Sequence, residues 1–154
     1  MNIAADVAAA MDDLGLGDEF SYDDLLAAMQ SRQERPLTIV DCAELPPREG
    51  INALWLPTER VDVVLCVPTD SALHRQQFVL HELAHMLLNH GDDLLVDPCD
   101  VLFPDIPPAT LRRLLRRQHL DTEPEILAEA LADRLAAAIR GSAAHESRFS
   151  EIFG

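Results

Sequence analysis

Two histidines and a glutamate, spaced as His-Glu-x-x-His, are the residues of this chain best suited to chemistry. His81 and His85 lie four residues apart. On a helix that spacing places both imidazole rings on one face, one turn apart. Two neutral imidazoles so placed can bind one zinc ion, and Glu82 lies beside them as a candidate general base. The pattern predicts a zinc site at which Glu82 moves the proton.

The segment around this pattern is apolar, which makes three buried polar side chains costly. Seven apolar residues cover nearly every face of a helix predicted over residues 71–90: Phe78, Val79, Leu80, Leu83, Met86, Leu87 and Leu88. Such a helix is buried, and polar groups buried without partners are unfavourable. A bound metal ion would remove that cost. The alternative is that His81 and His85 are core histidines bonded to backbone or carboxylate groups.

A hydrolytic zinc site needs a third protein ligand and an open position. The last predicted helix, residues 122–140, offers Glu125, Glu129 and Asp133 on one face, with alanines around Glu129 that would allow close helix packing. Glu129 is the predicted ligand, and Asp133 would accept the free N–H of a ligand histidine. The alternatives are a capping-box role for Glu125 and a solvated helix face for Glu129 and Asp133.

The remaining sequence predicts one α+β domain over residues 1–154, a small antiparallel sheet packed on a helical core. Its predicted parts are two N-terminal helices in 1–35, the sheet in 37–67, the motif helix of 71–90 and the third-ligand helix of 122–140. Strands are predicted at 37–42, 51–56 and 61–67, with a turn at 57–60, and a short helix at 109–120. Ser21 with Asp24 resembles a helix cap, and Gly141 is the predicted end of the last helix.

Composition narrows the function classes. The formal net charge is −15 and every one of the twelve basic residues is arginine, so direct nucleic-acid binding is not expected and a basic protein partner would suit the surface. Residues 1–20 carry no basic residue, and no run approaches the roughly 18 apolar residues of a membrane span. Three cysteines without a C-x-x-C pair favour a reducing compartment. We therefore expect a cytoplasmic protein.

The segment from Val61 to His90, above all Arg75-Gln76-Gln77-Phe78-Val79-Leu80-His81-Glu82-Leu83-Ala84-His85, resembles the ImmA/IrrE-type metallopeptidases. These are cytoplasmic zincins that cut or inactivate helix-turn-helix repressors. Their later E-x-x-A-[ND] segment corresponds here to Glu129-Ala130-Leu131-Ala132-Asp133. The resemblance covers residues 51–90 and 123–140 and implies a zincin-like fold with Glu129 as third ligand. It also implies a role in transcription regulation and the stress response.

Three departures from the family are visible. Ala84 stands where the family often has glycine, Asp133 where it often has asparagine, and no proline follows the apolar run at 136–139. Many relatives carry a fused helix-turn-helix domain, for which this chain has no room, so a repressor partner would be a separate protein.

The predicted activity is hydrolysis of a peptide bond in that partner, with zinc supplying Lewis acidity and Glu82 acting as general base. A strand of the hairpin would hold the extended peptide. One rival is a non-proteolytic binding module that sequesters a regulator or serves in a toxin–antitoxin pair. The other is a structural metal site, which normally uses cysteine, and no cysteine adjoins the motif. His90 is interpreted as a helix-end residue, and His74 and His119 as surface residues.

Overall fold

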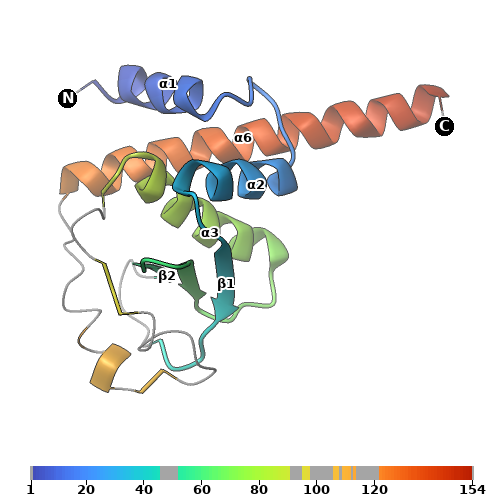
Figure 1. The fold of residues 1–154 in the computed structure, drawn as a ribbon. Coiled ribbons are helices and arrows are strands. Elements are labelled where there is room, and N and C mark those ends of the chain that lie inside the picture. Colours follow the sequence, from blue (N-terminus) through green and yellow to red (C-terminus); the bar gives the residue numbers. More distant parts are fainter. Residues whose placement is uncertain are drawn as a thin grey trace.

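Helices and a three-stranded sheet make up the described part of the chain (Figure 1). The structure is a computed structural model that describes residues 2–45, 52–90, 95–97, 106–107, 109–111, 113 and 122–153. In chain order the elements are α1 (Ile3–Leu14), α2 (Tyr22–Gln33), β1 (Leu37–Asp41), β2 (Ala53–Pro57), β3 (Asp62–Cys66), α3 (Ala72–Leu87) and α6 (Thr122–Phe153).

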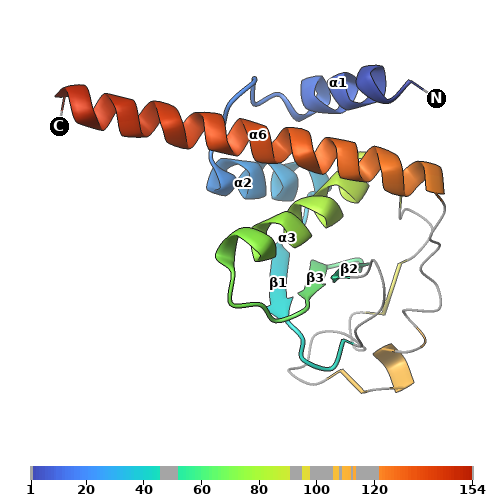
Figure 2. The same ribbon diagram turned by 180° about the vertical axis from the view of Figure 1, so that it is seen from behind.

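The elements form layers around α3. Figures 1 and 2 show α6 running across the molecule, with α1 on one side of it and α2 and α3 on the other, and the sheet beyond α3. Side-chain oxygens of Asn2, Ser21 and Ser71 accept backbone N–H bonds at the starts of α1, α2 and α3. The predicted Ser21 cap is therefore confirmed, and both N-terminal helices pack on the body of the fold.

The sheet is mixed, which corrects the prediction of an antiparallel one. Its strand order is β1-β3-β2, with β2 antiparallel and β1 parallel to the central β3. The predicted turn between β2 and β3 is present, and Thr58 closes it by bonding Val61. β2 follows β1 in the sequence but pairs with the opposite side of β3. β1 and β3 therefore lie side by side and run in the same direction.

Both faces of the β2–β3 hairpin are covered, and every residue of the two strands is buried. Alternate residues such as Trp55 and Val64 join the core with the helices. The residues between them, such as Leu54 and Leu65, pack in a second cluster with Val96. Because side chains alternate across a strand, a continuously apolar sequence indicates a sheet buried on both faces.

The last helix is longer than predicted. Gly141 lies inside α6, which continues to Phe153. A Cβ at Gly141 would lie 2.8 Å from Oε1 of Glu19, so glycine permits a close approach there and does not end the helix. The predicted helix at 109–120 lies mostly outside the described residues. Among the helices described, none is long and apolar enough to cross a membrane.

Candidate metal centre

The two histidines of the motif lie on one face of α3, and both side chains are partly exposed. Its other faces are filled by seven buried residues: Val79, Leu80, Glu82, Leu83, Ala84, Met86 and Leu87. The side chains of His81 and His85 are 22% and 14% exposed, so solvent reaches both rings. The predicted helix thus presents both imidazoles together, within reach of the first turns of α6.

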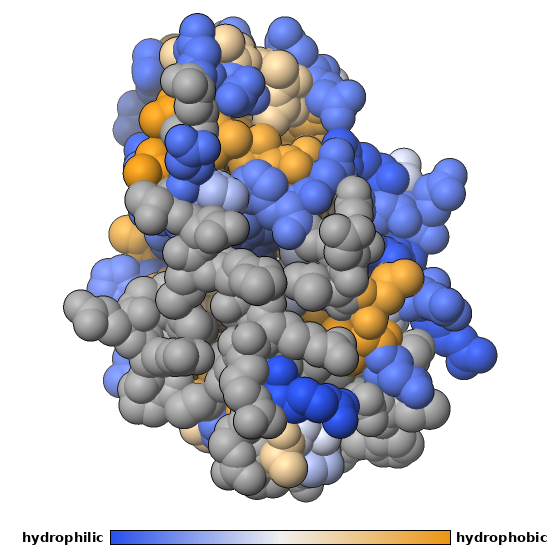
Figure 3. All heavy atoms as spheres, turned by 90° about the vertical axis from the view of Figure 1, so that its left-hand side faces the viewer, coloured by the Kyte–Doolittle hydropathy of each residue, from blue (hydrophilic) through white to orange (hydrophobic). Residues whose placement is uncertain are grey.

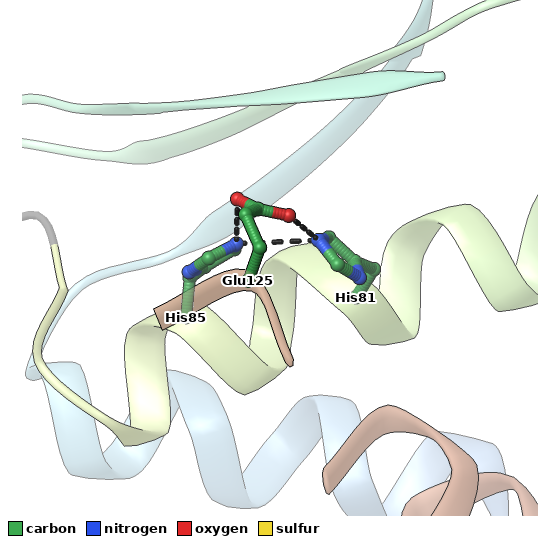
Figure 4. A group of neighbouring side chains, drawn as sticks. All are labelled: His81, His85 and Glu125. Carbon is green, nitrogen blue, oxygen red and sulfur yellow. Dashed lines mark hydrogen bonds and ion pairs between the residues drawn. The ribbon is translucent and has the colours of Figure 1, made fainter. Parts of the chain in front are cut away.

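Glu125 lies between the two imidazoles (Figure 4). Its Oε2 atom is 3.0 Å from Nε2 of His81, and its Oε1 atom is 3.1 Å from Nε2 of His85. The two Nε2 atoms are 3.2 Å apart. These three side chains form a group whose ligand atoms all lie within 4.8 Å of one another, close enough to bind one metal ion.

The spacing of these atoms fits a small tetrahedral ion. Two nitrogens bound to zinc at the usual length and the tetrahedral angle are about 3.3 Å apart. The observed Nε2–Nε2 separation of 3.2 Å is close to that value. Two imidazoles and a carboxylate are also a donor set that zinc uses in catalytic sites. His81, His85 and Glu125 therefore fit a zinc ion in geometry and in chemistry.

Glu129, the ligand predicted from the sequence, lies on the other side of His81. Its Oε2 atom is 3.0 Å from Nδ1 of His81, and its side chain is 60% exposed. Glu125 and Glu129 share one face of α6, but α6 crosses α3 so that its first turn covers the Nε2 atoms. The structure thus places Glu125, for which a capping-box role was the alternative, at the position predicted for Glu129.

Asp133 lies one turn further along, away from the imidazoles. Its Oδ1 atom accepts a hydrogen bond of 3.4 Å from Nε2 of Gln77, and the residue is exposed. The orienting position predicted for Asp133, at the second nitrogen of a motif histidine, is held by Glu129 at His81. Asp133 and Glu129 are one helical turn apart, as are Glu129 and Glu125, so both predicted roles are shifted by one turn.

His90 also contributes to the cluster, although only a helix-end role was predicted for it. Its Nδ1 atom is 2.9 Å from Nδ1 of His85. His74, by contrast, is exposed and stacks on Phe78, as expected for a surface histidine. His119 lies outside the described residues. The signal that could have identified His90 is the Asn89-His90 pair, since asparagine tolerates the left-handed conformation that turns a chain back.

Glu82 is 8% exposed and faces the sheet. Burial raises the pKa of its carboxyl group to about 8, the negative charge of Glu125 adds to the rise, and the backbone N–H of Trp55 opposes it. Burial also lowers the pKa of His85. At neutral pH His85 is therefore an uncharged imidazole with a lone pair available to a metal ion.

A hollow of about 620 Å³ lies elsewhere, between α1 and α6. Apolar side chains gather in the upper, helical part of the view in Figure 3. The residues around the hollow are Ile3, Ala4, Val7, Ala8, Met11, Asp12, Asp18, Ala130 and Arg134. None of them belongs to the candidate metal centre.

Comparisons with family models, with curated proteins and with solved structures find no match for this chain. The family resemblance of the motif segments therefore stays a prediction.

Proposed function

We propose that this chain is a zinc-dependent endopeptidase that cuts a protein partner, with His81, His85 and Glu125 binding the metal and Glu82 acting as general base. The observation that carries the proposal is the convergence of three ligand atoms from α3 and α6 within 4.8 Å, next to a buried glutamate. Three protein ligands leave a tetrahedral ion one open position, as hydrolysis requires. A zinc ion would supply Lewis acidity there, which makes water a nucleophile near neutral pH and polarises a carbonyl group.

Glu82 suits proton transfer because it is buried beside the proposed ligands, where a bound cation would favour its ionised form. It would accept the proton of the attacking water and pass it to the leaving amine. The contact with the Trp55 N–H holds the carboxylate toward β2. The neutral His85 needs no deprotonation before it binds a metal ion.

β2 supports the choice of an extended peptide as substrate. It lies at one edge of the described sheet, next to the helix that bears the motif. Extended peptides add to such edges by backbone hydrogen bonds. The backbone N–H of Val96 donates a hydrogen bond of 2.7 Å to the Pro57 carbonyl. This carbonyl, at the end of β2, is therefore already paired within the chain.

By resemblance, the partner is a separate helix-turn-helix repressor, and the cytoplasm is the site of action. A net charge of −15 suits a partner with a basic DNA-binding face. Such a partner would be drawn to the chain most strongly at low ionic strength, because salt screens the attraction.

The test compares wild type with Glu82→Gln at equal zinc loading. Immobilised Glu82→Gln protein retains the repressor from the native host, and the captured repressor is then incubated with each protein. Wild type should release fragments identified by mass spectrometry, while the variant should cut more slowly by about 10²–10⁴-fold, since it lacks the base. Repressor released intact by both proteins would instead support the sequestering module.

A further inference from the structure

The chain turns back sharply after α3 and brings His90 against the motif. Asn89 has a φ of 58°, in the left-handed region. The backbone N–H of Asn89 donates to the Met86 carbonyl at 3.1 Å, and that of His90 donates to the His85 carbonyl at 3.0 Å. Such paired bonds close a helix end and fix the direction of the next side chain. His90 is thereby held beside His85.

The contact between the two rings joins the nitrogens that face away from Glu125. The Nδ1 atoms of His85 and His90 are 2.9 Å apart, with the ring planes tilted by 60°. At this distance one nitrogen donates a proton and the other accepts it. A neutral imidazole that offers Nε2 to a metal ion carries its proton on Nδ1. His85 is therefore the donor and His90 the acceptor when a metal is bound.

We propose that His90 is a positioning residue for the metal centre. It accepts the Nδ1–H of His85, and so holds that ring with Nε2 directed at the ion. Glu129 stands in the equivalent position at Nδ1 of His81. Both motif histidines then have a fixed partner on the nitrogen that the metal does not use. This inference rests on the metal-binding part of the proposed function, and on no other part of it.

The experiment measures the zinc dissociation constant of the full chain by competition with a chromogenic chelator. His90→Phe keeps an aromatic ring but removes the acceptor, so it should weaken zinc binding by about 10- to 100-fold. His90→Asn places an amide oxygen near the lost Nδ1 atom and should restore most of the affinity. His74→Ala is the control, because His74 is an exposed histidine near the start of α3. Far-UV circular dichroism establishes that all four proteins keep their helices.

The outcomes separate this inference from the peptidase proposal. Equal zinc affinity of wild type and His90→Phe would overturn the role of His90 and leave the peptidase proposal intact. Equal weakening by His90→Phe and His90→Asn would also overturn it, because the acceptor would then be irrelevant. A wild-type chain that binds zinc but cuts nothing would overturn the peptidase alone. A wild-type chain without stoichiometric zinc would overturn both.

Discussion

Trp55 contacts two polar groups, Asp62 and Glu82, which belong to clusters of different composition. Its indole N–H donates to Asp62 at 3.0 Å, while its backbone N–H donates to Glu82. Asp62 is 1% exposed and also binds Arg35 at 2.9 Å, and Arg35 donates to the Thr58 carbonyl at 2.7 Å. In this first cluster each charge has an opposite charge or a donor beside it.

The second cluster gathers two imidazole rings and a carboxylate around one point. Nε2 of His81, Nε2 of His85 and both oxygens of Glu125 converge on one point. Each of these four atoms can offer a lone pair to a metal ion. A cation at that point would satisfy all of them. The first cluster is thus complete within the chain, whereas the second is arranged as a set of possible metal ligands.

The largest effect is expected when both motif histidines of the second cluster are removed. His81→Ala/His85→Ala should bind no stoichiometric zinc, because two of the three proposed ligands are gone. Metal-free, it should unfold close to the temperature of metal-free wild type, because the pairs that both rings form with Glu125 are partly exposed and contribute little stability. Metal analysis and thermal unfolding in chelator give both results. Unchanged zinc content would show that the centre is elsewhere.

Substitution in the first cluster, around Asp62, should lower stability and leave zinc binding unchanged. Asp62→Ala leaves the Arg35 guanidinium half-buried without its carboxylate, and loss of one partner from a buried pair costs about 3–5 kcal/mol. Zinc affinity should hardly change, because Asp62 touches no proposed ligand. Asp62→Asn is the matched control: it keeps the shape and the acceptor for Trp55, so it should cost less. Urea unfolding and zinc competition measure the two effects. A stable Asp62→Ala protein with weakened zinc binding would reverse the roles of the clusters.

The sequence predicted the parts of the site that depend on local periodicity. His81, Glu82 and His85 come from one helix, so spacing alone places them relative to one another. The two N-terminal helices, the motif helix, the hairpin turn and the Ser21 cap were predicted for the same reason. The parallel pairing of β1 with β3 was not predicted, because an apolar strand sequence does not indicate whether its partner is parallel or antiparallel.

The third ligand depends on how two helices cross, and a sequence does not state that angle. Glu125 and Glu129 are one turn apart on the same face of α6, so a shift of one turn along the helix exchanges them. The resemblance favoured Glu129, and the structure places Glu125 at the Nε2 atoms. His90 was missed because its position depends on the backbone of Asn89.

Glu82 links the two clusters through Trp55, and its titration sharpens the contrast between them. Its folded-state pKa of about 8 exceeds the ordinary value of 4.5, so the folded chain favours the neutral acid. That contribution to stability is fully present below about pH 4.5 and is lost as the pH rises through about 8. The unfolding temperature of metal-free wild type should therefore fall relative to Glu82→Gln across this range. His85 is present in both proteins, so its titration largely cancels. A constant difference from pH 5 to 9 would contradict the buried, proton-holding Glu82.

The finest test concerns Glu125 and Glu129, two glutamates of α6 that face different nitrogens of His81. If the convergence at the Nε2 atoms is the metal centre, Glu125→Ala removes a ligand, whereas Glu129→Ala removes only the partner of Nδ1 in His81. Loss of such a partner weakens metal binding by about 10- to 100-fold, so Glu129→Ala should keep stoichiometric zinc at high concentration while Glu125→Ala loses more affinity. Glu123→Ala, an exposed glutamate of the same first turn, is the control for lost charge. Zinc titrations of the three variants at one pH decide the ranking. If Glu129→Ala proves the weaker binder, α6 sits one turn further along α3 in the zinc-bound protein, and the ligand predicted from the E-x-x-A-D segment is the correct one.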